Sequence, residues 1–356
     1  MPRPILVTYD LGALRRNFAT LRERAPGARI WAVVKSNAYG HGLVRVARTL
    51  READGFAVAE INDAVRLRDA GLHRPVLLLE GFFEARDVTT CVDYMAHAVI
   101  HSSEQLAMLE RTAVKKPLDA WLKMNTGMNR LGFSPVRFMD AHRRLTSRAR
   151  VNSIGMMTHF ADADGAGGVA EQLAVFADGT RAFQGERSAA NSAAMLRFPE
   201  THFDWVRPGI AIYGCSPFPD QSAAELGLEP VMTLSSRLIA VQELEAGARV
   251  GYGGAFVAPR DMRVGVVACG YADGYPRHAP SGTPVLVDGR RAGIAGRVSM
   301  EMITVDLSRI PEAAVGSEVT LWGQGLPADE VAHAAGTVSY ELLTAVSPRV
   351  PVIERE

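Results

Sequence analysis

The chain has 356 residues, and its 39 basic side chains balance 39 acidic ones, so the formal net charge is zero. Apolar residues make up 47% and charged residues 22%, which fits a folded protein of about two domains and excludes an extensively disordered chain. The charge balance argues against nucleic acid or an anionic membrane as a partner, because binding to either usually requires a basic excess.

The cysteines indicate a reducing compartment. Cys91, Cys215 and Cys269 are widely spaced and odd in number, so they form neither a disulfide framework nor a zinc-binding pattern. The first residues lack the pattern of a signal peptide, and no run of eighteen apolar residues predicts a membrane span. We therefore expect a cytoplasmic protein without a metal centre and without a membrane or nucleic-acid partner.

From about residue 10 to residue 229, apolar runs alternate with amphipathic stretches. Asp10 is a candidate cap for a helix that begins at Leu11, and Ser102 followed by Gln105 resembles a capping box. The apolar runs predict eight strands: Ile30–Val34, Gly55–Ala59, Val76–Leu79, Ala96–Ile100, Leu118–Leu122, Ser153–Met157, Arg187–Ala190 and Asp204–Val206. Eight alternating strand–helix units predict an α/β fold, a (β/α)₈ TIM-type barrel, with an open doubly wound sheet as the alternative.

The pattern changes near Pro230. Beyond it, strand-like runs follow one another closely: Leu238–Val241, Arg263–Ala268, Pro284–Val287, Met302–Val305 and Val319–Trp322. Asp288-Gly289 is a hairpin signal, and Asp329–Ala335 is a candidate helix closed by Gly336. We therefore predict a barrel over residues 1–230 and a C-terminal, mostly antiparallel β domain over residues 231–356.

Polar side chains gather where the predicted barrel strands end. They follow the first, fifth, sixth, seventh and eighth strands and are Lys35, Lys123, Arg130, His159, Asn191, Ser192, Arg207, Gly209 and Ile210. In a barrel of this kind these positions converge on one face, where the loops after strands seven and eight commonly bind phosphate. The sequence therefore predicts one active site at that face.

Each of these side chains also has an ordinary structural interpretation. Lys35 could be a surface lysine at a strand end, although a buried ammonium with a lowered pKa would suit Schiff-base chemistry. His159 could be a hydrogen-bonded core histidine, and Arg207 a salt-bridging arginine. Tyr252 lies between two glycines and could be a turn residue. Neither a P-loop nor a GxGxxG motif is present, which disfavours nucleoside triphosphates and nicotinamide cofactors.

A series of motifs carries a family resemblance along the whole chain. The segment Ala32-Val-Val-Lys35-Ser-Asn-Ala-Tyr39-Gly-His-Gly resembles the cofactor-lysine signature of the alanine racemases. The other matching motifs begin at Lys123, Thr158, Asn191, Arg207, Val250, Gly270 and Tyr340, in the family's order. The resemblance implies a pyridoxal 5′-phosphate (PLP) enzyme, an isomerase that interconverts L- and D-alanine, with a barrel and a C-terminal β domain in a homodimer with shared active sites.

The resemblance also assigns roles to residues. Lys35 would hold PLP as an aldimine and act as one proton-transfer base, and Tyr252 from the other subunit would be the opposite base. Arg207, supported by His159, would meet the pyridine nitrogen. Phosphate ligands would be Tyr39, Ser192, Gly209, Ile210 and Tyr340, with Asn191 beside them. Arg130 and the backbone of Met300 would bind the substrate carboxylate, and Lys123 matches a lysine that is carbamylated in many members. An entrance corridor would comprise Asp164, Tyr271, Arg277 and Arg297.

Three positions depart from the commonest family pattern. Ser36 replaces an alanine, which we expect to be harmless, and Glu301 stands where aspartate is usual and could shift the entrance. Ser188 stands where some members carry histidine, so a supporting contact to the site is not expected from it.

Two alternatives remain at this point: another PLP enzyme on the same architecture, such as a serine or broad-spectrum racemase or a decarboxylase, and a non-catalytic PLP carrier. Arg207 and Tyr252 argue against a decarboxylase, and the C-terminal domain argues against a carrier. The resemblance does not distinguish supply of D-alanine for peptidoglycan from its breakdown.

Overall fold

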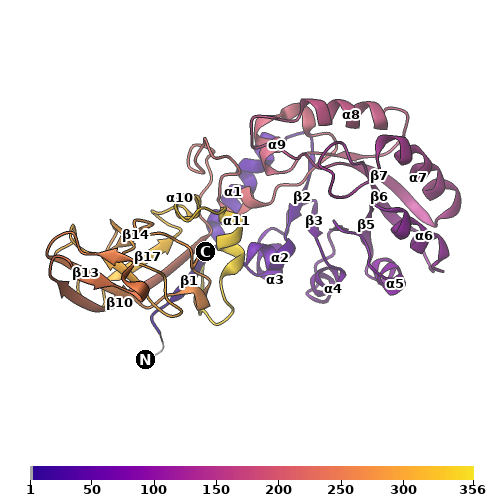
Figure 1. Ribbon diagram of the computed structural model, residues 1–356. Coiled ribbons are helices and arrows are strands. Elements are labelled where there is room, and N and C mark those ends of the chain that lie inside the picture. Colours follow the sequence, from indigo (N-terminus) through magenta and orange to yellow (C-terminus); the bar gives the residue numbers. More distant parts are fainter. Residues whose placement is uncertain (1–2) are drawn as a thin grey trace.

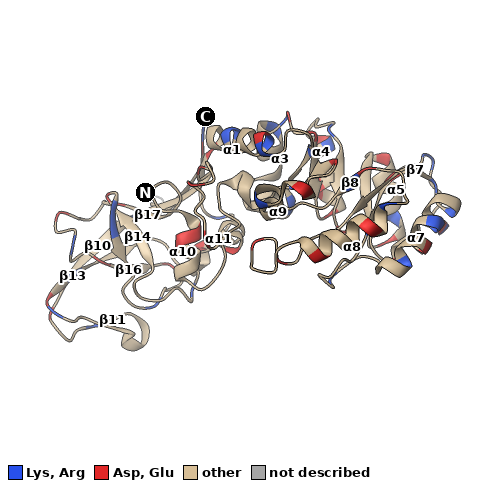
Figure 2. Ribbon diagram, turned by 90° about the horizontal axis from the view of Figure 1, so that it is seen from above, with Lys and Arg blue, Asp and Glu red and all other residues tan. Residues whose placement is uncertain are grey.

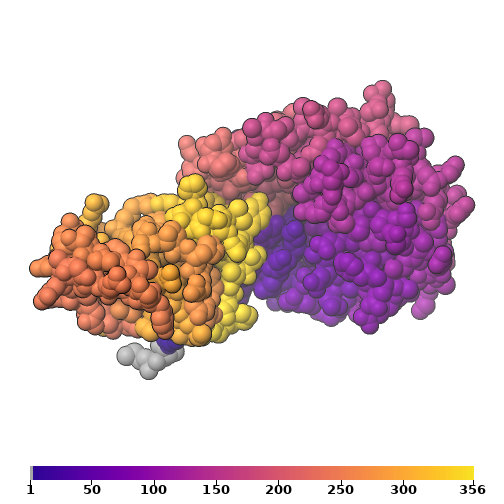
Figure 3. Space-filling model, in the orientation of Figure 1, coloured from indigo at the N-terminus to yellow at the C-terminus, as the bar shows by residue number. Residues whose placement is uncertain are grey.

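A computed structural model describes residues 3–356 of the chain and divides into two lobes (Figures 1 and 3). The larger lobe is a closed barrel of parallel strands surrounded by helices, and the smaller lobe is built on a mostly antiparallel sheet. This arrangement confirms the predicted fold class and excludes an open doubly wound sheet.

The barrel closes where its last strand pairs with its first. Arg29 and Ile30 of β2 pair in parallel with Trp205 and Val206 of β9. The barrel strands are β2 (Arg29–Val33), β3 (Gly55–Val58), β4 (Val76–Leu78), β5 (Ala96–Ile100), β6 (Leu118–Lys123), β7 (Val151–Met157), β8 (Arg187–Ser188) and β9 (Trp205–Val206). All eight predicted strands are confirmed, with ends that differ by at most two residues.

Helices connect the barrel strands and cover their outer face (Figures 1 and 2). They are α3 (Leu43–Thr49), α4 (Ile61–Asp69), α5 (Ala85–Asp93), α6 (Ser103–Arg111), α7 (Pro135–Arg148), α8 (Ala170–Thr180) and α9 (Ser192–Arg197), with short 3₁₀ turns at Pro199–Thr201 and Ile210–Tyr213. The short segment α2 (Lys35–Tyr39) follows β2 and is a left-handed turn rather than a regular α-helix. Helix α1 (Leu11–Arg24) precedes the first barrel strand and packs against α3 and α9, so it fills the last place in the ring. As predicted, Asp10 caps α1 by accepting a hydrogen bond from Ala13 N.

Aromatic rings fill the interior of the barrel. Trp31 of β2 stacks on Trp205 of β9, with ring centroids 4.1 Å apart, and meets Trp121 of β6 edge to face. Glycines on neighbouring strands make room for these rings: a Cβ on Gly55 would lie 2.2 Å from the Trp31 ring, and one on Gly155 would lie 2.6 Å from Trp121. The barrel is therefore a packed core, which holds the strand ends in fixed positions.

The second domain is organised around one long strand, β10, which pairs along its length with β1, β17 and β13. Its strands are β10 (Met232–Leu244), β11 (Arg249–Val250), β12 (Phe256–Val257), β13 (Met262–Val267), β14 (Pro284–Val287), β15 (Arg290–Gly293), β16 (Ile303–Asp306), β17 (Glu318–Trp322) and β18 (Val352–Arg355). Helices α10 (Ala328–Ala334) and α11 (Ser339–Ala345) and 3₁₀ turns at Tyr252–Gly254 and Tyr271–Asp273 complete it. Asp288 and Gly289, both with positive φ, form the predicted hairpin between β14 and β15.

Strand β1 (Leu6–Asp10) comes first in the chain but lies in the second sheet. It pairs antiparallel with β10 and parallel with β18. The chain therefore starts in the sheet, passes through α1 into the barrel and returns to the sheet, while the division at residue 230 stays a prediction. Within residues 3–356, no helix is both long enough and apolar enough to cross a membrane.

Candidate active site

A cavity of about 380 Å³ lies at the carboxyl ends of the barrel strands. Its lining includes every site residue that the sequence predicts in the barrel apart from the corridor residue Asp164, and Tyr340 of α11 completes it. The residues around the cavity are Val33, Lys35, Tyr39, Leu79, Glu80, Lys123, Arg130, Leu131, Met157, His159, Asn191, Ser192, Arg207, Gly209, Ile210 and Tyr340. The barrel strands bring these residues together because their carboxyl ends meet at one face.

The backbone immediately after Lys35 turns in the left-handed sense. Residues 36 to 39 have φ values between 52° and 56°, and none of them is glycine. A left-handed residue with a side chain costs about 1–2 kcal/mol, so the turn costs on the order of 4–8 kcal/mol. Surrounding contacts must offset this cost, and strain of this kind is concentrated at functional sites.

The cavity gathers four cationic side chains around one carboxylate. Lys35, Lys123, Arg130 and Arg207 line it, and Glu80 is the acidic residue among the described lining residues. Burial lowers the pKa of the Lys35 amine, Arg130 lowers it further, and Glu80 partly opposes both. Burial and the charges of Arg207, Arg130 and Lys35 lower the pKa of Lys123 to about 8. The cavity therefore suits anionic groups, and its two lysines hold their protons less tightly than exposed lysines do.

Arg207 is buried without a carboxylate partner among the residues described. Its guanidinium donates to Ser188 Oγ at 2.5 Å and to the carbonyls of Thr158 and Ala189 at 2.6 and 3.1 Å. The expectation that Ser188 gives no supporting contact is therefore wrong, because a serine hydroxyl on β8 is close enough to accept from Arg207. Burial lowers the pKa of Arg207 to about 10, which still leaves it charged at neutral pH.

His159 lies beside this guanidinium. Its Nδ1 is 3.5 Å from Arg207 Nη2, and burial, reinforced by the nearby cations, holds the pKa of His159 well below its usual value. The imidazole is therefore neutral, and its Nδ1 faces Arg207 as an acceptor. This geometry fits a histidine that orients the arginine rather than one that exchanges protons.

Hydroxyl groups and backbone amides also line the cavity. Ser192 Oγ accepts from the backbone N–H of Gly209 at 2.8 Å, and Asn191 caps α9 by accepting from Ala194 N. A Cβ on Gly209 would lie 2.4 Å from Tyr39 Oη, so only glycine leaves room for that hydroxyl. Burial raises the pKa of both Tyr39 and Tyr340, which keeps their hydroxyls protonated as hydrogen-bond donors.

The remaining predicted residues lie on the second domain, outside this cavity. Tyr252 is 74% exposed and follows β11, at the end of the domain that is remote from the barrel (Figure 2). Arg297 lies against the turn of Tyr252, since a Cβ on Gly253 would be 3.7 Å from its Nη1. Tyr271 N donates to the carbonyl of Ser299, next to Met300.

Arg277 lies over the Tyr271 ring at 6.0 Å, so Tyr271 and Arg277 contact each other, while Arg297 is the corridor residue placed at the turn of Tyr252. Asp164 belongs to the barrel side instead, where it lines a neighbouring pocket with Tyr340. Within one chain the two sets of predicted residues are thus separate: the barrel residues line the cavity, and the exposed group around Tyr252 does not.

Glu80 is a cavity residue that was not predicted from the sequence. It follows β4 by two residues, so it occupies the strand-end position that led to the other site residues. Its backbone carbonyl is held by His101 Nε2 and Gln105 Nε2 at 3.0 and 2.8 Å. The sequence feature that could have identified Glu80 is its position as a polar residue directly after the apolar run Val76–Leu79.

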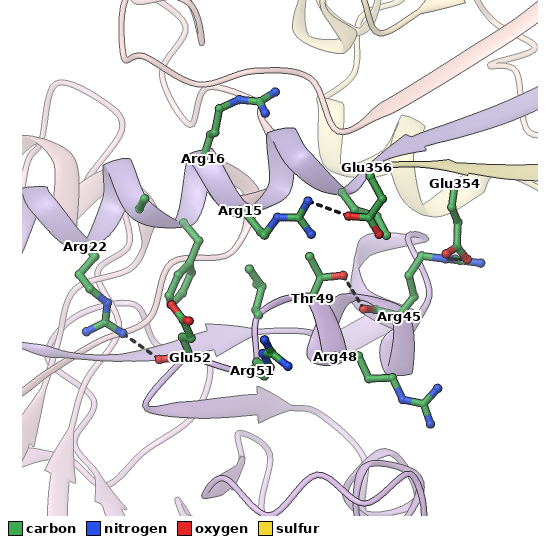
Figure 4. A pocket seen from close by; sticks show the side chains of 14 residues that line it. Arg15, Arg16, Arg22, Arg45, Arg48, Thr49, Arg51, Glu52, Glu354 and Glu356 are labelled. Atoms are coloured by element: carbon green, nitrogen blue, oxygen red, sulfur yellow. Dashed lines mark hydrogen bonds and ion pairs between the residues drawn. The ribbon is translucent and has the colours of Figure 1, made fainter.

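A larger cavity of about 870 Å³ lies elsewhere, between α1, α3 and the C-terminus (Figure 4). It is rich in arginine, but most of these arginines are paired. Arg15 contacts Glu356 at 2.8 Å, Arg45 contacts Glu354 at 2.5 Å, and Arg22 contacts Asp54 at 2.9 Å. Two of these ion pairs tie β18 and the C-terminus to barrel helices, which gives this basic cavity a structural explanation.

Comparisons with known proteins agree with the motif series. The alanine racemase N-terminal domain matches residues 9–217, and the alanine racemase C-terminal domain matches residues 231–354. Alanine racemase of Paraburkholderia phytofirmans is 55% identical over 353 residues and that of Polaromonas naphthalenivorans 56% over 362, each covering 99% of both chains.

Among solved structures, the biosynthetic alanine racemase of Pseudomonas aeruginosa superposes with a TM-score of 0.97 at 48% identity, covering 99% of this chain and 100% of that one. The Bacillus anthracis alanine racemase, solved with L-Ala-P bound, superposes with a TM-score of 0.85 at 31% identity, and the match covers 100% of this chain and 96% of that one. Matches over both domains disfavour the non-catalytic carrier, and the relatives' activity disfavours the other racemases. The chain belongs to the alanine racemase family.

Proposed function

We propose that this chain is a PLP-dependent alanine racemase whose active site combines the barrel cavity of one subunit with the Tyr252 face of a second. The observation that carries the proposal is the cavity itself. The half-buried Lys35 amine at a strand end shares this cavity with three other cations and with hydroxyl and amide groups. Alanine carries a carboxylate and PLP a phosphate, so both would add negative charge to a cationic cavity.

The residues present fit PLP. The room that Gly209 leaves beside the Tyr39 hydroxyl, together with Ser192, Ile210 and Tyr340, provides donors for a phosphate group. Lys35 supplies the amine to which the cofactor's aldehyde would attach, and Arg207, with His159 at its side, would face the pyridine nitrogen. When bound, PLP supplies an electron sink that makes the Cα–H of alanine acidic. An arginine gives up its proton reluctantly, so Arg207 would keep that sink weaker than an acidic partner would.

Racemisation requires two bases on opposite faces of Cα, because one proton leaves and another returns from the other side. Lys35 would serve one face, and burial helps it to act as a base because it lowers the pKa of the amine. Tyr252 is exposed and outside the cavity of its own chain, so the partner subunit's Tyr252 would serve the other face. A homodimer with two-fold symmetry would build two such shared sites.

Arg130 and the backbone of Met300 would bind the substrate carboxylate, and Tyr271, Arg277 and Arg297 with Asp164 would line the approach. The Lys123 ammonium would first lose one proton, and the neutral amine would then attack carbon dioxide to give a carbamate and release a second proton. The reaction replaces a buried positive charge with a negative one that can pair with Arg130. The lowered pKa of Lys123 favours this, because only the neutral amine attacks carbon dioxide.

We further propose that the chain divides near residue 230 and acts in the cytoplasm, where it supplies or degrades D-alanine. All three cysteines are free and buried, which suits a reducing compartment.

Two measurements test the proposed function. Chiral analysis of the product should show interconversion of L- and D-alanine, with serine turned over much more slowly. Borohydride reduction should fix PLP to Lys35. Label on Lys115, Lys116 or Lys123, or faster conversion of serine than of alanine, would contradict the proposal.

A further inference from the structure

The left-handed turn after Lys35 is closed by a buried histidine. Backbone hydrogen bonds hold part of the turn: the N–H groups of Ala38, Gly40, His41 and Gly42 donate to the carbonyls of Val34, Ser36, Ala38 and Asn37 at 2.9, 3.1, 3.0 and 2.8 Å, and none of these bonds reaches the carbonyl of Tyr39. The carbonyls of Ala38 and Tyr39 both point at the ring of His41, which is fully buried. Its Nδ1 lies 3.1 Å from Ala38 O and 2.9 Å from Tyr39 O.

These distances determine the form of the imidazole. Both neighbours of Nδ1 are carbonyl oxygens, so Nδ1 must carry the hydrogen and donate to them. Nε2 is buried and has no hydrogen-bond partner among the residues described. Burial lowers the pKa of His41 to about 4, so the ring is neutral throughout the physiological range. His41 therefore makes its polar contacts through one N–H group, and only to the turn.

An aromatic stack fixes the ring of His41. It lies on Tyr213, with centroids 4.6 Å apart, and close to Tyr9 of β1 at 5.2 Å. Tyr213 also stacks on Tyr39 at 4.7 Å, and its hydroxyl donates to Val33 O at the end of β2. The stack therefore connects both ends of the segment that contains Lys35: the strand before it and the tyrosine after it.

We propose that His41 is a positioning residue for the active site: its Nδ1–H holds the strained turn and thereby fixes Lys35 and the Tyr39 hydroxyl relative to Gly209. This inference rests on the proposed function of Lys35 as the cofactor lysine. It assigns to His41 no contact with substrate or cofactor, since His41 does not line the cavity.

The test uses two substitutions in the full-length holoenzyme. His41→Phe keeps a flat ring for the stack but removes the donor, whereas His41→Asn keeps an N–H near the position of Nδ1. His97→Phe is the matched control: His97 also has a buried, unpartnered ring nitrogen and packs edge to face on Trp31, but it lies outside the cavity. We expect His41→Phe to lower kcat about 10–100-fold, the cost of misplacing a catalytic group by about 1 Å.

Hydrogen exchange gives a readout that is independent of turnover. In His41→Phe the amides of residues 38–42 should exchange at least about tenfold faster, a change that His97→Phe should not produce. His41→Asn should restore most of the lost turnover and protection. Unchanged kcat and exchange in His41→Phe, or equal losses in the Phe and Asn variants, would overturn the inference.

Failure of the proposed function would look different. If borohydride placed PLP on another lysine, the role of Lys35 would be wrong, whatever exchange showed at residues 38–42. If the label stayed on Lys35 while His41→Phe loosened the turn without lowering kcat, the role of His41 alone would be refuted.

Discussion

The hydroxyl of Tyr39 occupies the space that a side chain on Gly209 would need, since a Cβ there would lie 2.4 Å from Tyr39 Oη. Tyr39 comes from the turn after β2, and Gly209 from the loop after β9. Because β2 and β9 are paired neighbours, closure of the barrel sets the distance between these two residues, which we propose as phosphate ligands. The proposed phosphate site would thereby depend directly on the barrel's geometry.

This relationship predicts the effect of a single methyl group. Gly209→Ala should displace the Tyr39 hydroxyl and weaken PLP binding by about tenfold or more, equivalent to about 1.4 kcal/mol. Titration of the apoenzyme with PLP measures the change. Gly27→Ala is the control, because a Cβ on Gly27 meets nothing within 4 Å. Equal PLP affinities in the two variants would argue against Tyr39 and Gly209 as joint phosphate ligands.

Arg130 offers a test of the substrate carboxylate site. Arg130→Lys replaces a planar guanidinium with a single ammonium, so bidentate contact with a carboxylate is lost while the positive charge remains. We expect kcat/KM for alanine to fall at least about 100-fold while the PLP content stays near that of the wild type. Parallel losses of cofactor and activity would show instead that Arg130 supports the structure.

Lys123 should carry a carbamate. The lowered pKa of about 8 means that a substantial fraction of the free amine is neutral under mildly alkaline conditions, so carbamylation should proceed more readily as pH rises towards 8. With ¹³C-labelled carbon dioxide, NMR should show one carbamate signal that is absent in Lys123→Ala. A high-resolution map with a bare ammonium at Lys123 would contradict this prediction.

The buried histidines predict how stability varies with pH. His41 is neutral in the folded chain down to about pH 4, whereas the unfolded residue takes up a proton near pH 6.5. The contribution of His41 to the free energy of unfolding is therefore complete above pH 6.5. As pH falls from 6.5 towards 4, this contribution is lost, and the free energy of unfolding decreases by up to about 3 kcal/mol. His159, whose pKa is also lowered, should act in the same direction.

Urea unfolding at a series of pH values, with PLP in excess, measures this dependence. His41→Phe should flatten the fall in unfolding free energy between pH 6.5 and 4, and His278→Asn at an exposed position should not. If the unfolding free energy of His41→Phe depended on pH as steeply as that of the wild type, His41 would not be the source of the pH dependence.

The sequence predicted the barrel well because most of its strands are buried on both sides and appear as apolar runs. It did not predict β1 or β18. Every residue of β18 is exposed, including the charged Glu354 and Arg355. The strand therefore has no buried face and no alternation of apolar and polar residues that would reveal it in the sequence. It pairs with β1, which lies more than 340 residues earlier in the chain, a contact that local patterns do not encode.

Prediction of the site was limited in a similar way. Residues at strand ends were identified from position alone, and Glu80 could have been identified by the same criterion. The contact of Ser188 with Arg207 could not, because it depends on the register between β8 and β9. The capping box at Ser102 formed only in part: Gln105 N donates to Ser102 Oγ, but the Gln105 side chain binds His101 N and the carbonyls of Glu80 and Phe82.

The shared active site is the central claim, and subunit mixing tests it most directly. Lys35→Ala and Tyr252→Phe should each be inactive as homodimers. In a mixed dimer, one site would carry both substitutions and the other neither. Random exchange makes about half of the dimers mixed, so activity should return to about a quarter of the wild-type value. If exchange is demonstrated by mass spectrometry and the mixture stays as inactive as its components, Lys35 and Tyr252 do not meet across a subunit interface.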